Sequence, residues 1–145
     1  MSFREKTAWI TAITIVICFG AYYGLIFAGQ VPAHSWRSFH LGLACIIALV
    51  VLQVGLNFIT ALLNPKEART PRDERERLIQ WRSHTVGYYV LMFGMAAVLI
   101  STHVPRADPD LIIVIFDTVN FGVLVMVIAA LSVAIAQIIM FRRGS

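Results

Sequence analysis

The sequence predicts an all-α fold, a four-helix transmembrane bundle with both termini in the cytoplasm and a third helix that extends into the cytoplasm. Its 145 residues are 59% hydrophobic and only 14% charged, whereas soluble domains carry about 25% charged residues. Four apolar runs are each long enough for a bilayer core, which needs about 20 helical residues. If these runs alternate in direction, ten of the twelve Lys and Arg residues fall on one side. Because loops rich in Lys and Arg face the cytoplasm, this side is expected to be cytoplasmic.

The first two runs predict helices over residues 7–28 and 39–63. Neither run contains a proline, and Pro32 lies between them, where a helix is expected to break. Because Arg4 and Lys6 precede the first run, a cleaved signal peptide is the alternative. The run exceeds the roughly 7–15 apolar residues of such peptides, so we expect a retained helix.

A stripe of small residues lies on the first helix, with Gly20, Gly24 and Ala28 recurring every four positions. This small-xxx-small spacing permits close approach of a second helix. It predicts either packing within the bundle or self-association, and the spacing alone does not separate the two.

The third helix is predicted over residues 71–104 and the fourth over residues 111–141. Thr70 is placed to cap the third helix, with Pro71 at its first position, a common start signal. No helix breaker separates Pro71 from the apolar run, so this helix should begin in the cytoplasm. The fourth run is longer than one span needs, which leaves open whether Asp117 is buried or interfacial.

Residues 64–83 form a predicted cytoplasmic segment that holds half of all charged residues in the chain. The segment is a docking surface for a cytoplasmic partner, a patch that touches anionic lipid, or a solvated helix extension that sets the topology. Its mixed charge signs argue against direct nucleic-acid binding and against a purely lipid-binding patch. The candidate partner-binding residues are Arg72, Asp73, Glu74, Arg75, Arg77 and Ile79.

Residues 73–79 read D-E-R-E-R-L-I, and the segment 87–91, G-Y-Y-V-L, follows at the start of the membrane helix. This pattern resembles an uncharacterised bacterial family of small multi-pass membrane proteins with a D-E-R-x-x-x-I segment before a membrane helix. The resemblance implies the bacterial inner membrane and a cytoplasmic regulatory protein as partner. It brings no catalytic residue with it.

Polar residues also gather near the predicted outer ends of the helices. His and Asp side chains together relay protons, bind transition metals or hold a polar headgroup. The alternative is that they lie at headgroup level and contact water. No cofactor is predicted outright, while haem on His40 and His103, a quinone or a metal ion are candidate occupants. The candidate residues are His40, His103, Asp117, Asn120, Tyr22 and Tyr23.

Three amides, Gln53, Asn57 and Gln137, lie deeper in the predicted membrane and are expected to bond between helices. The chain carries no P-loop, G-x-S-x-G, dinucleotide turn or H-E-x-x-H motif. We therefore expect a non-enzymatic sensor, anchor or accessory subunit for a cytoplasmic partner. The alternatives are a small redox, quinone or metal-handling protein and a dimeric small-solute transporter. Besides the lipid bilayer, a second copy or a larger membrane complex is an expected partner.

Overall fold

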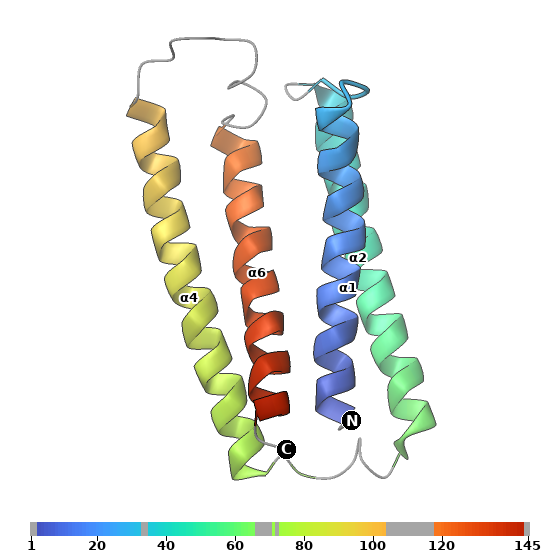
Figure 1. Cartoon of the computed structure of the whole chain (residues 1–145). Coiled ribbons are helices and arrows are strands. Elements are labelled where there is room, and N and C mark those ends of the chain that lie inside the picture. The colour runs from blue at the N-terminus through green and yellow to red at the C-terminus, as the bar shows by residue number, and fades with distance from the viewer. Residues whose placement is uncertain (1–2, 33–34, 66–70, 72, 104–117, 144–145) are drawn as a thin grey trace.

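The computed structural model describes residues 3–32, 35–65, 71, 73–103 and 118–143. Within these residues the chain folds into long helices and contains no strand (Figure 1). The helices are α1 (Phe3–Phe27), α2 (Trp36–Leu63), α4 (Glu74–His103) and α6 (Thr118–Arg143). The predicted all-α, four-helix fold is confirmed.

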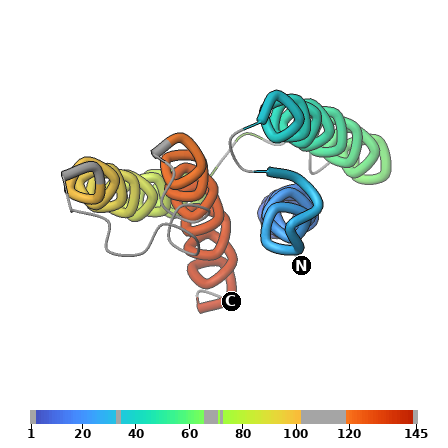
Figure 2. Tube along the Cα trace, turned by 90° about the horizontal axis from the view of Figure 1, so that it is seen from above, coloured from blue at the N-terminus to red at the C-terminus, as the bar shows by residue number. Residues whose placement is uncertain are grey.

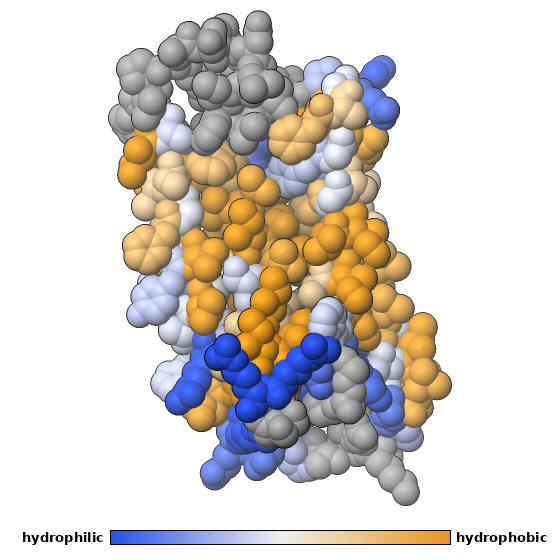
Figure 3. All heavy atoms as spheres, viewed as in Figure 1, coloured by the Kyte–Doolittle hydropathy of each residue, from blue (hydrophilic) through white to orange (hydrophobic). Residues whose placement is uncertain are grey.

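Each of the four helices is long enough and apolar enough to cross a bilayer. Figure 3 shows hydrophobic side chains over the middle of the bundle, with hydrophilic ones gathered at the end where both termini lie. Large apolar side chains such as Val54, Phe58 and Phe93 are more than 60% exposed. Apolar surface of this extent is incompatible with water. The chain is therefore an integral membrane protein.

Helices α1 and α6 lie in the middle of the assembly, with α2 and α4 on the two flanks (Figure 2). Helix α6 packs most extensively against α4, and α1 packs against both α2 and α6. No residue in the most apolar part of α2 is buried. The bundle thus consists of two antiparallel pairs, α1–α2 and α4–α6, which are joined along α1 and α6.

Two glycines explain why α4 and α6 pack so closely. A Cβ atom added at Gly94 would overlap the Val125 side chain, and one added at Gly87 would overlap Val133. Because the two glycines are seven residues apart, they lie on the same face of α4. Absent side chains at these positions let the two backbones approach, as is usual for helix pairs in membranes.

The small-residue stripe on α1 does not pack closely against another helix among the described residues. No atom lies within 4 Å of the Cβ position of either Gly20 or Gly24, and Ala28 is exposed. The opposite face of α1 carries the core instead, with Ile15 and Phe19 buried. The sequence predicted that the stripe serves either packing within the bundle or self-association. The described helices do not use it for packing within the bundle.

The helix ends differ from the predicted bounds by a few residues. Helix α4 begins at Glu74, three residues after the predicted start at 71. The Asp73 carboxylate accepts the first backbone N–H, that of Glu74, at 2.8 Å. Aspartate is a favoured residue at this position because it satisfies a donor that has no partner in the helix. Thr70 and residues 111–117 of the predicted fourth helix lie outside the described residues.

Candidate functional site

Tyr22, Tyr23 and Asn120 form a hydrogen-bonded cluster at the bundle end away from the termini. The Tyr22 hydroxyl donates to Asn120 Oδ1 at 2.7 Å, and the Tyr23 hydroxyl donates to the Asn120 backbone oxygen at 2.9 Å. The two rings meet edge to face, 4.9 Å between centroids. On the other side, the Tyr22 ring reaches α2, where a Cβ on Gly42 would lie 3.4 Å from it. The cluster therefore ties α1 to α6 and is adjacent to α2.

The other predicted members of this group are placed differently. His40 is exposed at the start of α2, and its ring lies 6.2 Å from that of Trp36 and 5.8 Å from that of Phe39. Asp117 and the side chain of His103 lie outside the described residues. Among the residues that the structure describes, no group of three or more His, Cys, Asp or Glu side chains could hold a metal ion. The redox, quinone, metal and transporter hypotheses stay predictions.

Two of the three membrane amides bond to a neighbouring helix. Gln53 Nε2 donates to Thr11 Oγ1 at 3.1 Å, between α2 and α1. Gln137 Nε2 donates to Ser83 Oγ at 3.1 Å, between α6 and α4, and Ser83 is fully buried. Asn57 differs, because its buried Oδ1 has no hydrogen-bond partner in the described structure.

Replacing Asn57 with leucine is expected to stabilise the protein by about 1–2 kcal/mol, since a buried acceptor without a donor is costly. Gln53→Leu, one turn away on the same helix, provides the matched control. This variant removes the hydrogen bond from Gln53 to Thr11. It should destabilise the protein by about 0.6 kcal/mol, the average for hydrogen bonds between membrane helices. Unfolding free energies from SDS titration in mixed micelles measure both. Shifts of the same sign in the two variants would contradict this account of Asn57.

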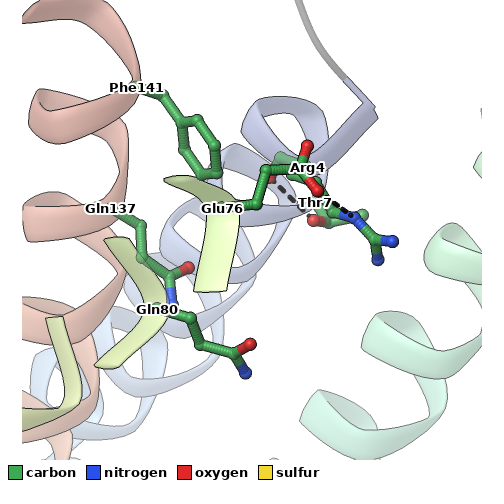
Figure 4. Close-up of a pocket in the computed structure, with 6 residues that line it drawn as sticks. All are labelled: Arg4, Thr7, Glu76, Gln80, Gln137 and Phe141. Atoms are coloured by element: carbon green, nitrogen blue, oxygen red, sulfur yellow. Dashed lines mark hydrogen bonds and ion pairs between the residues drawn. The ribbon is translucent and has the colours of Figure 1, made fainter. Parts of the chain in front are cut away.

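The bundle end that carries the termini, called here the charged end, contains a small polar cavity of about 150 Å³. Figure 4 shows that α1, α4 and α6 each contribute side chains to it. Arg4 Nε lies 3.5 Å from Glu76 Oε2 at its edge, and both side chains are partly buried. The lining residues are Arg4, Thr7, Glu76, Gln80, Gln137 and Phe141. With one ion pair, two amides and a hydroxyl, this cavity suits water or a small polar molecule.

A second ion pair at the charged end joins α1 directly to α6. Arg142 Nε lies 3.5 Å from Glu5 Oε1, and the Arg142 guanidinium carbon lies 5.3 Å from the centroid of the Trp9 ring. A cation over an indole face is attracted by the ring quadrupole. The two ion pairs hold the first turn of α1 against both α4 and α6.

The start of α4 presents two different faces. Ile79 is 7% exposed and packs inside the bundle, on the same side as Glu76 and Gln80. Asp73, Glu74, Arg75 and Arg77 are exposed. Leu78 and Trp81 are 44% and 74% exposed among them. We call Glu74, Arg75, Arg77 and Leu78 the α4 surface. Arg72 lies outside the described residues.

Sequence reasoning did not predict that Arg4, Thr7, Gln80 and Phe141 line a cavity, because nothing in the spacing of these residues brings them together.

Comparison with known proteins adds no assignment to these sites. No family model, curated protein or solved structure matches this chain. The resemblance of the 73–79 segment to a bacterial membrane family thus stays a prediction.

Proposed function

We propose that this protein is a non-enzymatic integral membrane protein of the bacterial inner membrane that anchors or senses a cytoplasmic partner through the α4 surface. The division of α4 into two faces carries this proposal. Ile79 is buried and Glu76 pairs with Arg4, so one face of this part of α4 packs against the bundle. Arg75, Arg77 and Leu78 then face outward at fixed positions.

The chemistry of the α4 surface favours a protein partner. Arginine is enriched at protein interfaces and among their hot spots, and Leu78 supplies an apolar contact between charged neighbours. Because Glu74 lies among the arginines, an anionic lipid surface is a poorer complement. The basic residues of the charged end support a cytoplasmic orientation, where such a partner would meet the surface.

Contacts behind the α4 surface support the sensing role. Glu76 is part of α4 and pairs with Arg4 of α1 at the cavity edge. Leu78 is two positions after Glu76 on the same turn of α4, so a partner that shifts this turn would act on the Arg4–Glu76 pair. The binding surface and the bundle would be coupled through this contact.

Exchanging charges within the α4 surface tests the proposal. The double variant Glu74→Arg/Arg77→Glu keeps the number of basic residues, so the topology signal is preserved. A photocrosslinker at Leu78 in cells should give a discrete protein adduct in the parent chain, and the exchange should reduce its yield about tenfold, as expected when charge pairs at an interface are reversed.

Two controls make this experiment decisive. The exchange Glu5→Arg/Arg142→Glu alters charges at the same end but off the α4 surface, and it should leave the adduct unchanged. A crosslinker at Phe93, which is 74% exposed on the membrane part of α4, should give no cytoplasmic adduct. If Leu78 and Phe93 crosslink alike, or if both exchanges act equally, the α4 surface is not the docking site.

A further inference from the structure

Helices α1 and α6 leave an apolar groove between them on the half of the bundle nearest the charged end. Its volume is about 340 Å³, and its lining is entirely apolar. Among the lining residues, Ala12 and Leu131 are less exposed, while Ile13 of α1 and Ile135 of α6 are exposed.

The shape of the groove follows from the side chains along the α1–α6 contact. Ala8, Ala12 and Ala134 are buried, and these small residues let the two backbones approach. Ile13 and Ile17 are 52% and 61% exposed, so they flank the contact without covering it. Residues 9–17 of α1 span about 12 Å at 1.5 Å per residue, close to the roughly 15 Å of one bilayer leaflet.

The mouth of this groove is basic. Trp9 lines it, and the Arg142 guanidinium lies over the Trp9 ring, on a side chain that is 63% exposed. Lys6 precedes Trp9 by three residues and therefore lies on the same face of α1. Glu5, the carboxylate in contact with Arg142, only partly offsets the positive charge of Arg142 and Lys6.

We propose that this groove binds an anionic phospholipid, with one acyl chain along Ile13 and Ile135 and the phosphate at Arg142 and Lys6. An apolar slot with cations at the headgroup level complements the two parts of such a lipid. A second groove, between α4 and α6, gives the contrast. It measures about 400 Å³ and is lined by His84, Tyr88 and apolar residues. Among the described residues, no Lys or Arg is found over its aromatic side chain as Arg142 is over Trp9. It should not discriminate between headgroups.

Fluorescence quenching of Trp9 tests this proposal. The full chain carrying Trp36→Phe and Trp81→Phe retains Trp9 as its one indole. It is reconstituted in phosphatidylcholine with small fractions of phosphatidylglycerol or phosphatidylcholine brominated near the headgroup end of the chain. Each basic residue at a membrane surface contributes about a five-fold preference for anionic lipid, so brominated phosphatidylglycerol should associate at least about five-fold more strongly.

Two variants that break the same ion pair separate lipid binding from a structural effect. Arg142→Gln should lower the anionic preference about five-fold, whereas Glu5→Gln should preserve or raise it. A purely structural role for the pair predicts equal changes in both variants and would overturn the proposal. Equal quenching by the two lipids would also overturn it, as would a preference that survives Arg142→Gln. Absence of quenching by either lipid would show that something else, such as a second copy, covers the groove.

Discussion

Replacing Gly94 with alanine is expected to destabilise the protein by about 1–3 kcal/mol, the usual penalty for overpacking a close contact. The added Cβ would overlap one methyl group of Val125 on α6, and the second methyl carbon would lie only 3.0 Å away. Valine is β-branched and has few rotamers, so its side chain cannot turn aside freely. Gly87→Ala meets Val133 in the same way, and it also approaches the Ala129 backbone oxygen at 3.3 Å. The two helices would have to separate to relieve either overlap.

Gly20→Ala and Gly24→Ala are the matched controls for this prediction. Both positions lie within α1, and no atom of another described helix lies within 4 Å of the added methyl group. Alanine is the better helix former by about 1 kcal/mol in water, so these variants should be neutral or stabilised. SDS titration of the four variants measures the difference. If Gly20→Ala destabilises as much as Gly94→Ala, then the stripe on α1 has a neighbour, and self-association becomes its explanation.

These four glycines show what the sequence could and could not predict about the fold. The length and apolar character of each run determine that a helix crosses the membrane, and the four helices were predicted on that basis. Which face of a helix meets a neighbour depends on contacts far apart in the chain. The regular spacing of Gly20 and Gly24 indicates a close contact that the described helices do not make. Gly87 and Gly94 do make one, but a single seven-residue spacing between two glycines does not mark a helix contact in the sequence.

In the candidate sites, too, the sequence predicts one aspect of a residue's position and leaves another open. Position along a helix gives depth in the membrane, which placed Tyr22, Tyr23, Asn120 and His40 at similar levels. Depth does not give the direction of a side chain around the helix axis. The first three residues meet, whereas the His40 ring lies beside aromatic residues of its own helix. The Arg4–Glu76 pair joins residues distant in the chain, and no local pattern marks such a pair.

Replacing Asn120 with leucine is expected to destabilise the protein by about 1–3 kcal/mol, because it removes the side-chain acceptor of a buried hydroxyl. Tyr22 and Asn120 are both 5% exposed, and their bond joins the two halves of the bundle. A double-mutant cycle with Tyr22→Phe isolates this bond. Its coupling energy should be about 0.6–1.7 kcal/mol, the measured range for bonds between membrane helices.

Tyr23→Phe provides the control cycle because Tyr23 donates to the backbone oxygen of Asn120. Leucine keeps that oxygen, so the effects of Tyr23→Phe and Asn120→Leu should add within about 0.5 kcal/mol. The two tyrosines are adjacent and their rings touch, so a general loosening of the region would couple both of them to Asn120 equally. Coupling confined to Tyr22 would identify the side-chain bond as the contact that holds α1 against α6. Equal coupling in both cycles would instead mean that Asn120 acts through the position of the α6 backbone.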